Sequence, residues 1–196
     1  ILTNMKVTFT NLIKASEYGE KKFKKKIITG FSKLISSNQF IGGDQVKKFE
    51  REFSKYVNIK NCITVGNGTD ALEIAIEALN LPKNSEVILP VNTWISTAEA
   101  VTRNGLKVVF CDISLNDYSI DLDDLKKKIS KKTSAIIAVH LYGYPSDLIG
   151  LKKLIRGRNI KIIEDCAQAH GTRIRKKHVG TFGDISTFSF FPGKNL

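Results

Sequence analysis

Apolar side chains recur along the chain with two different periods, and each period predicts one type of element. Between residues 16 and 57 the apolar positions are three or four residues apart, which is typical of one face of a helix. Further on, short apolar runs without polar interruption predict buried strands, and helical spacing returns between most of them. The expected helices are 16–37, 46–56, 71–79, 122–129 (capped by Asp121) and 148–155, and the expected strands are 62–65, 86–89, 107–111, 135–140, 161–163 and 186–191.

This alternation of strands and helices predicts an α/β fold with a largely parallel sheet covered by helices on both faces. The connecting turns are short, as at 81–85 and Asn104-Gly105, and no internal repeat or linker is visible. A chain of 196 residues can bury a core and is most simply one domain. We expect a helical segment over about 12–57, followed by a sheet region over about 58–196.

The net charge of +12 raises the question of nucleic-acid binding. Most lysines, however, flank apolar positions at helix spacing, as in the run 21–26 around Phe23, and are better interpreted as solvated helix faces. The basic run 173–177 is a candidate for attracting a phosphorylated substrate, although an exposed hairpin turn explains it better. No recognition helix or stacking-aromatic motif accompanies the charge, so we expect no nucleic-acid partner.

The cysteines and the N-terminal segment indicate the cellular compartment in which the protein works. Cys62, Cys111 and Cys166 follow no C-x-x-C spacing and lie in or beside apolar runs, so they predict core thiols in a reducing compartment and argue against disulfides or a zinc site. No secretory pattern and no apolar run of membrane-helix length is visible, so we expect a cytoplasmic protein without a membrane partner. The first residue is Ile and Met5 is a plausible natural start, so we expect a sequence cut arbitrarily.

Ligands in open α/β sheets bind at the carboxyl ends of the strands, and the stretch from Gly66 to Ala71 falls at such an end. Its glycines allow a tight turn, and the amides of Thr69 and Asp70 would open a helix, where an anion such as phosphate is favoured. The stretch also fits the dinucleotide pattern G-x-G-x-x-A, but the following strand and turn, 86–92, end without the acid that would hold a ribose. A Walker loop does not fit Gly193-Lys194, which lacks the earlier glycine and the following Ser or Thr.

Three further stretches supply an aromatic ring, an acid and an amine. Trp94 follows the expected strand 86–89 and is either a packing residue or a ring that stacks on a flat ligand. Asp165 lies just after the expected strand 161–163, and Lys194 follows the expected strand 186–191. A lysine amine can form a Schiff base with the aldehyde of pyridoxal phosphate (PLP), while a carboxylate keeps the pyridine nitrogen protonated so that the ring accepts electrons. Taken in this order, the stretches predict a PLP enzyme.

Four ordered motifs closely resemble the DegT/DnrJ/StrS family of sugar aminotransferases. They are GNGTDAL (66–72), PVNTWIST (90–97), EDCAQAHG (164–171) and FSFFPGKNL (188–196), and the resemblance also includes 40–46 and 140–143 and runs from about Met5 to the last residue. It implies the large domain of the PLP-dependent transferase fold type I, built on a seven-stranded, mostly parallel sheet, and a homodimer with active sites at the subunit interface. The roles that it implies are covalent attachment and proton transfer for Lys194, pairing with the pyridinium nitrogen for Asp165, ring stacking for Trp94, proximity to the 3′-oxygen for Gln168, and phosphate binding for the amides of Thr69 and Asp70 and the hydroxyl of Ser189.

The resemblance also implies a reaction, namely transfer of an amino group, usually from glutamate, to a keto group of a nucleotide-diphosphate sugar. A few members have His in place of the lysine and act as dehydratases, and Lys194 argues against that subclass. Stretches 68–71 and 191–194 resemble members that act at C3 of deoxythymidine-diphosphate sugars. An inactive or regulatory member of the same fold is an alternative, although the lysine, the acid and the phosphate loop argue against it.

Family members are much longer than this chain. We therefore expect a smaller C-terminal domain to be absent, and the 196-residue polypeptide made alone to have no transaminase activity.

Overall fold

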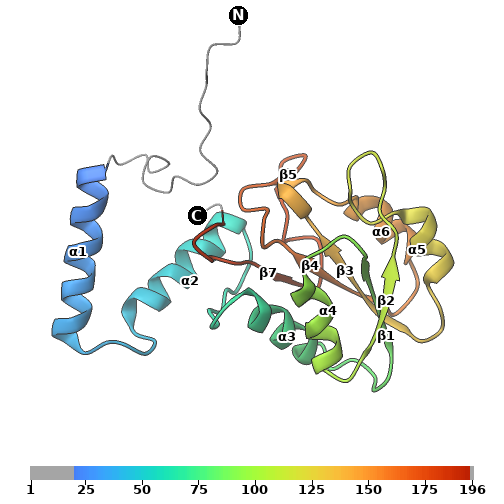
Figure 1. The fold of residues 1–196 in the computed structure, drawn as a ribbon, viewed down its shortest axis with the longest axis horizontal. Coiled ribbons are helices and arrows are strands. Elements are labelled where there is room, and N and C mark those ends of the chain that lie inside the picture. Colours follow the sequence, from blue (N-terminus) through green and yellow to red (C-terminus); the bar gives the residue numbers. More distant parts are fainter. Residues whose placement is uncertain (1–19, 195–196) are drawn as a thin grey trace, which may run out of the picture. The chain divides into compact units, whose positions relative to one another are not determined.

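The computed structural model describes residues 20–194, and Figure 1 labels its elements. The chain divides into two compact units, residues up to 50 and residues from 51 onward, which are described separately. In the first unit, α1 spans Glu20–Ser37, and α2 (Asp44–Val57) begins there and continues into the second. Both helices confirm the helical spacing of this region, while the expected first turn at 16–19 lies outside the described residues. No described helix is long and apolar enough to cross a membrane.

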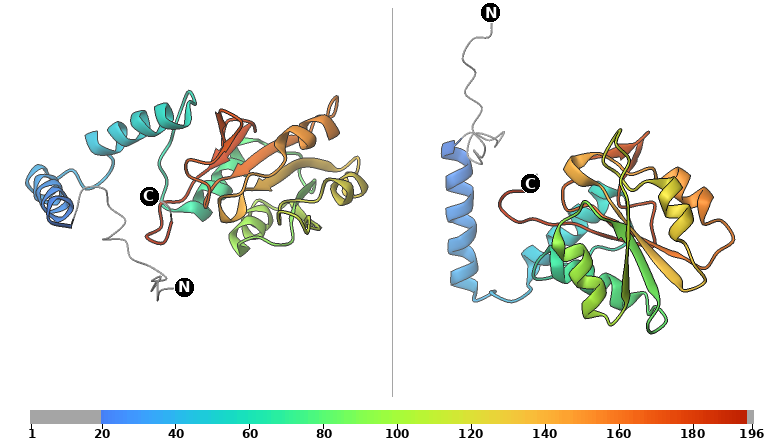
Figure 2. Two further views of the ribbon diagram at one scale, coloured as in Figure 1. Left: turned by 90° about the horizontal axis from the view of Figure 1, so that it is seen from above. Right: turned by 45° about the vertical axis from the view of Figure 1, so that its right-hand side comes forward.

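The second unit contains a parallel sheet of five strands in the order β2-β1-β3-β4-β7. The strands span Glu86–Pro90 (β1), Lys107–Cys111 (β2), Thr133–Val139 (β3), Lys161–Asp165 (β4) and Ile185–Thr187 (β7), and the helices are α3 (Gly68–Ala78), α4 (Ile95–Arg103), α5 (Leu122–Lys128), α6 (Leu148–Leu154) and the short 3-10 turn η1 (Leu141–Gly143). The parallel sheet between helices confirms the predicted α/β class (Figures 1 and 2).

The core lies in two layers, one on each face of the sheet. Because side chains alternate along a strand, Ile137 of β3 and Ile163 of β4 point to one face, where they pack with Leu72 and Ile76 of α3 and Ala100 and Val101 of α4. Ile136 and Ile162 point to the other face, together with Leu125 of α5 and Leu148 and Leu151 of α6. Burying each such aliphatic side chain contributes about 1.5–3 kcal/mol, so both faces must be covered.

A two-stranded hairpin, β5 (Arg173–Ile174) and β6 (Lys177–His178), follows β4 in the chain. Its turn contains Arg175 in the left-handed region, with φ of 57°. The hairpin confirms the turn predicted for the basic run 173–177.

Two expected strands were wrong in whole or in part. Residues 62–65 form no regular secondary structure, and Ile63 is 80% exposed, so the apolar run there does not reflect burial in a sheet. The expected strand 186–191 ends at Thr187, because the backbone then enters local turns in which Phe191 N donates to Ser189 Oγ and Lys194 N to Phe191 O. Among the described residues the main sheet therefore has five strands, where the resemblance implied seven.

Candidate active site

Two of the residues predicted at the carboxyl edge of the sheet, Asp165 and Thr69, contact hydroxyl groups at the start of α4 that were not assigned to the site from the sequence. Thr97 on α4 donates a hydrogen bond to Asp165 at the end of β4, with an oxygen–oxygen distance of 3.2 Å. Thr69 at the start of α3 lies 2.8 Å from Ser96 at the start of α4, measured between hydroxyl oxygens. These contacts bring the first turns of two helices to the end of the central strands, as the crossover topology requires.

The start of α3 is shaped to accept an anion. Asn67 caps this helix, and its side-chain oxygen accepts hydrogen bonds from the amides of Thr69 (2.9 Å) and Asp70 (3.0 Å). The two amides assigned to phosphate from the sequence are therefore held by a carboxamide oxygen, which occupies the position of an anion at the positive end of the helix dipole.

Gly68 allows the segment that carries Ser189 to approach this turn. A Cβ atom at Gly68 would lie 3.0 Å from Ser189 Cβ and 3.2 Å from its Oγ. Ser189 is buried beside the first turn of α3, and this close approach requires glycine at position 68. We call the Ser189 hydroxyl and the Thr69 and Asp70 amides the cradle, because donors of this kind bind phosphate.

Asp165 is the buried acid of the site. It is 5% exposed, and its Oδ1 accepts from the amide of Ala167 at 3.1 Å while Oδ2 accepts from Thr97. Burial raises the pKa of the Asp165 carboxyl above its usual value, although the two hydrogen bonds and the charges of His140 and Lys194 act in the opposite direction. Such a carboxyl is suited to sharing a proton with a ring nitrogen.

Lys194 is half-buried in the turn that follows β7. Its charge acts on the pKa of both Asp165 and His170, so the ammonium group lies at the same edge of the sheet as the acid. The structure thus brings together the amine and the acid that the motifs predicted.

Two buried polar groups at this edge have no hydrogen-bond partner among residues 20–194. One is the hydroxyl of Thr187, which pairs in register with Asp165 and therefore points to the same face of the sheet. The other is the imidazole of His170, which packs against Phe188 and Phe190. Burial, followed by the charges of His178 and Lys194, lowers the pKa of His170, and a weaker contact with the Ser189 backbone acts in the opposite direction. Because unpaired buried polar groups are rare in native proteins, these atoms favour a polar ligand at this edge.

Trp94 and Gln168 lie on loops at the same edge. Trp94 is the residue before α4 and is 71% exposed, so its ring is free to cover a flat ligand. Gln168 Oε1 accepts from the amide of Tyr142 at 2.8 Å. Tyr142 is a non-glycine residue with φ of 56°, a strained conformation of the kind that clusters at functional sites, and sequence reasoning did not identify it.

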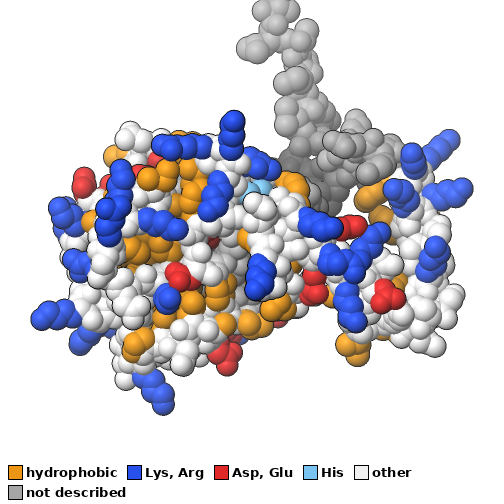
Figure 3. All heavy atoms as spheres, turned by 180° about the vertical axis from the view of Figure 1, so that it is seen from behind, with side chains coloured by type: hydrophobic (Ala, Val, Ile, Leu, Met, Phe, Trp, Pro, Cys, Tyr) orange, Lys and Arg blue, Asp and Glu red, His pale blue; other side chains and the backbone are white. Residues whose placement is uncertain are grey.

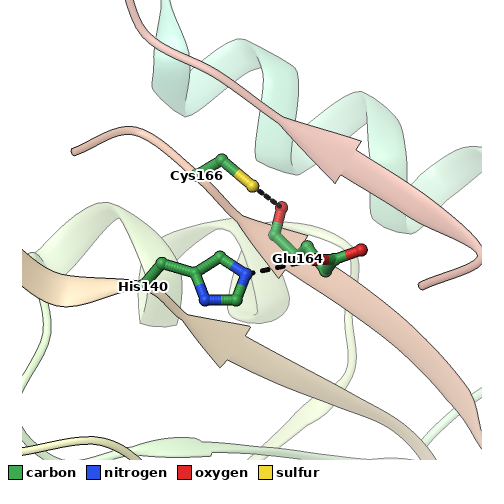
Figure 4. A group of neighbouring side chains, drawn as sticks. All are labelled: His140, Glu164 and Cys166. Atoms are coloured by element: carbon green, nitrogen blue, oxygen red, sulfur yellow. Dashed lines mark hydrogen bonds and ion pairs between the residues drawn. The ribbon is translucent and has the colours of Figure 1, made fainter. Parts of the chain in front are cut away.

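Glu164, which precedes Asp165, points to the opposite face and belongs to a separate buried cluster with His140 and Cys166 (Figure 4). The ligand-type atoms of the three residues lie within 4.8 Å of one another, as in a metal site. However, the Glu164 carboxylate accepts from His140 Nε2 (3.1 Å) and from the amides of Gly180 (2.7 Å), Phe182 (2.6 Å) and Gly183 (2.6 Å). Its lone pairs are thus engaged, and the cluster is a hydrogen-bond network that fixes the 180–183 loop.

Lys and Arg side chains are spread over the face of the molecule drawn in Figure 3 and do not gather in one band, which fits the solvated helix faces expected from the sequence. A hollow of about 660 Å³ at the amino edge of the sheet is lined by Lys83, Lys131, Lys132 and Lys161, among other residues. Another of about 480 Å³ lies beside the β5–β6 hairpin. Neither hollow includes Asp165, Ser189 or Lys194.

Comparisons with known proteins agree on one family. The family model described as the DegT/DnrJ/EryC1/StrS aminotransferase family matches residues 21–196. The GDP-perosamine synthase of Escherichia coli O157:H7 is 42% identical over 154 residues, which are 79% of this chain and 42% of that protein. The UDP-N-acetyl-3-dehydro-alpha-D-glucosamine 3-aminotransferase of Acidithiobacillus ferrooxidans is 42% identical over 170 residues, 87% of this chain and 46% of that protein.

Solved structures show the same fold. The crystal structure of DesV from S. venezuelae in complex with a ketimine intermediate has a TM-score of 0.89 and 32% identity, and the match covers 97% of this chain and 50% of that one. The GDP-4-keto-6-deoxy-D-mannose-3-dehydratase of E. coli with bound hydrated PLP has a TM-score of 0.80 and 34% identity, covering 84% of this chain and 44% of that one. The chain thus spans about half the length, or less, of the proteins that it matches.

Proposed function

The chain belongs to the DegT/DnrJ/EryC1/StrS aminotransferase family, and we propose on that basis that it is the cofactor-binding part of an enzyme that transfers an amino group to a keto group of a nucleotide-diphosphate sugar. The names of relatives from several organisms, which include GDP-, UDP- and dTDP-linked amino sugars, support this substrate class. We further propose glutamate as the amino donor and a homodimer as the working assembly, in a cytoplasmic pathway of polysaccharide synthesis.

We propose PLP as the cofactor, and residues of the site suit its phosphate and its ring nitrogen. The cradle of the Thr69 and Asp70 amides and the Ser189 hydroxyl would hold the phosphate, with the Asn67 oxygen giving up its place. Asp165 would face the ring nitrogen, and Thr187 would gain a polar neighbour on the same face of the sheet. When bound, PLP would supply an electron sink for amino transfer.

The residues of this chain supply positioning and proton transfer. Lys194 would hold the cofactor through its aldehyde, and its amine, when free, would take up and release a proton at Nζ. Asp165 would keep a positive charge on the ring nitrogen, while Trp94 covers one side of the ring and limits access of water. Gln168, oriented by the Tyr142 amide, would lie beside the ring oxygen.

The observation that carries this proposal is the chain of contacts at one edge of the sheet: Asp165 accepts from Thr97, and the neighbouring Ser96 contacts Thr69 beside the close approach of Gly68 and Ser189. Lys194 lies near enough for its charge to act on Asp165. These groups come from segments up to about 126 residues apart in the chain, and the parallel topology brings them to one edge of the sheet.

The proposal is tested with the complete protein purified with PLP. We expect an absorbance band at roughly 400–430 nm that borohydride removes, and transfer of nitrogen from glutamate to a keto sugar among GDP-, UDP- and dTDP-linked candidates. Lys194→Ala should abolish both signals, whereas Lys83→Ala, at an exposed loop position, should leave them unchanged. A protein that fails to bind PLP, or a Lys194→Ala variant that retains transfer, would overturn the proposal.

A further inference from the structure

Two threonine hydroxyls beside the start of α4 form a chain that ends on Asp165. Thr97 Oγ1 donates to Asp165 Oδ2 at 3.2 Å, and Thr93 Oγ1 lies 2.9 Å from Thr97 Oγ1. Thr97 is completely buried, and Thr93 is half-buried in the turn before the helix. In the described part of the chain, the donors to the carboxylate are therefore this hydroxyl chain on Oδ2 and the Ala167 amide on Oδ1.

The charge of the carboxylate sets the direction of the chain. An ionised carboxylate can only accept, so Thr97 must give its single hydroxyl proton to Asp165. Thr97 then has only lone pairs to offer at its contact with Thr93, so Thr93 donates there. If Oδ2 carried a proton, the direction can reverse, with Asp165 donating to Thr97 and Thr97 to Thr93. The two hydroxyls therefore have two arrangements, one for each ionisation state of Asp165.

We propose that Thr97, supported by Thr93, is a positioning residue that holds Asp165 ionised and oriented, so that the proton shared with a pyridine ring resides on the ring nitrogen. The inference rests on the proposed PLP function. Thr97 would thereby influence protonation of the cofactor ring through its hydrogen bond to Asp165.

Few groups around Asp165 offset its burial, so the Thr97 donor has a large effect on the ionisation of this carboxyl. The titratable groups that act on it are His140 after β3 and Lys194 after β7, while the adjacent Glu164 faces the other side of the sheet and the Cys166 thiol is kept neutral by burial. From α4 and β7 the facing groups are the uncharged hydroxyls of Thr97 and Thr187. Since burial disfavours the ionised form, loss of one of the few donors shifts the balance toward the protonated acid.

The test uses the complete protein and replaces the hydroxyl with a methyl group of the same shape. Thr97→Val removes the donor, Thr97→Ser restores it with less packing, and Thr93→Val removes only its support. The matched control is Thr102→Val on the same helix, because the Thr102 hydroxyl is exposed and donates to Glu99 O. A purely structural role for Thr97 would depend on volume, so Thr97→Val would behave like the parent and Thr97→Ser would not.

The first measurement needs no cofactor. In PLP-free protein labelled with ¹³C at the Asp carboxyl carbons, the Asp165 resonance is assigned by its loss in Asp165→Asn and followed against pH. We expect its titration midpoint to rise by about one pKa unit in Thr97→Val, a tenfold change in proton affinity worth about 1.4 kcal/mol, and by less in Thr93→Val. Thr97→Ser and Thr102→Val should titrate with the parent.

The second measurement uses PLP labelled with ¹⁵N in the ring. We expect the ring nitrogen to shift from its protonated toward its neutral resonance position in Thr97→Val at neutral pH, with recovery in Thr97→Ser. A parent protein that binds no PLP would refute the proposed function, while the carboxyl titration would still decide whether the hydroxyl chain controls Asp165. Equal midpoints in the parent and Thr97→Val would overturn the inference. If Thr97→Val fails to fold, unchanged midpoints in Thr93→Val would overturn it, and a raised midpoint would support it.

Discussion

Replacing Glu164 with Gln tests how much of the stability depends on one buried carboxylate. The Glu164 side chain is fully buried and accepts hydrogen bonds from four donors, which are His140 Nε2 and the amides of Gly180, Phe182 and Gly183. His140 Nδ1 accepts from the amide of Ser146 at 3.1 Å, so in the neutral ring the proton lies on Nε2 and points at Glu164. The network therefore has no spare acceptor.

The magnitude follows from counting donors. Gln has the same shape but replaces one carboxylate oxygen with an NH₂ group, so two of the four donors face another donor whichever way the amide is oriented. Hydrogen bonds to a charged group are worth about 1.5–3 kcal/mol each, and we expect Glu164→Gln to lower the free energy of unfolding by about 3–5 kcal/mol. The matched control is Glu73→Gln, which makes the same change in an exposed pair with Arg103 and should cost at most about 1 kcal/mol.

The assay is urea unfolding of both variants and the parent between pH 7 and pH 3. Burial opposes ionisation of Glu164, but the hydrogen bonds from His140, Gly180 and Gly183 outweigh it and hold the pKa of this carboxyl below its ordinary value of 4.5. For an acid with a depressed pKa, the stabilisation is present above the unfolded-state pKa and is lost as the pH falls through the folded-state pKa. The gap between parent and Glu164→Gln should therefore narrow in acid. A gap no larger than that of Glu73→Gln, or one that is constant over the whole range, would refute the reasoning.

Three further substitutions test the phosphate cradle, the Asp165 carboxyl and the backbone at Gly180. Asn67→Asp keeps the helix cap but places a negative charge in the phosphate cradle, so the dissociation constant of PLP should rise at least about tenfold with little loss of stability. Asn67→Ala removes the cap and should lower the free energy of unfolding in urea by about 1 kcal/mol. Burial raises the pKa of the Asp165 carboxyl above its ordinary value of 3.8. The stability that this side chain contributes is therefore complete below pH 3.8 and is lost as the pH rises through the folded-state pKa. Asp165→Asn should raise the melting temperature of PLP-free protein at neutral pH, and this gain should vanish in acid. Gly180→Ala, at φ of 88° with a Cβ 2.8 Å from Phe188, should cost at least about 1 kcal/mol more than Gly157→Ala, at φ of 78° with open space. Equal losses for the two glycines in urea unfolding would show that the Phe188 contact is relaxed without cost.

The strands and most helices could be predicted because their apolar positions are buried as the pattern requires. β1 and β3 are buried on both faces and contain continuous apolar runs, whereas β4 contributes only the pair Ile162 and Ile163. α4 carries little such signal, since its buried residues include Ser96 and Thr97, which pack through hydrogen bonds instead of apolar contacts. Residues 62–65 gave the opposite error, an apolar run whose side chains are mostly exposed.

Asp165 and Lys194 could be predicted because an acid and an amine after successive strands, in this order, suit the chemistry of PLP. The supporting residues could not be predicted, because their roles depend on three-dimensional neighbours. Thr97 acts through a hydrogen bond to Asp165, which is distant in the sequence. Tyr142 has a left-handed backbone conformation, which no side-chain pattern reveals. Asn67 had an available signal, since Asn directly before a helix is a common cap, and the cap explains why the amides of the cradle are held in place before any phosphate arrives.

The two acids at the end of β4 show how one strand separates structure from chemistry. Side chains alternate across the sheet, so Glu164 enters the layer of α5 and α6 while Asp165 enters the layer of α3 and α4. Hydrogen bonds from His140, Gly180 and Gly183 lower the pKa of Glu164, and the carboxylate fixes the 180–183 loop through the amides of Gly180, Phe182 and Gly183. Asp165 has fewer donors and a raised pKa, so its proton affinity remains open to control by a ligand and by the hydroxyl chain. Neighbouring carboxyls with opposite shifts mark a division of roles, and here the division follows directly from the alternation of the strand.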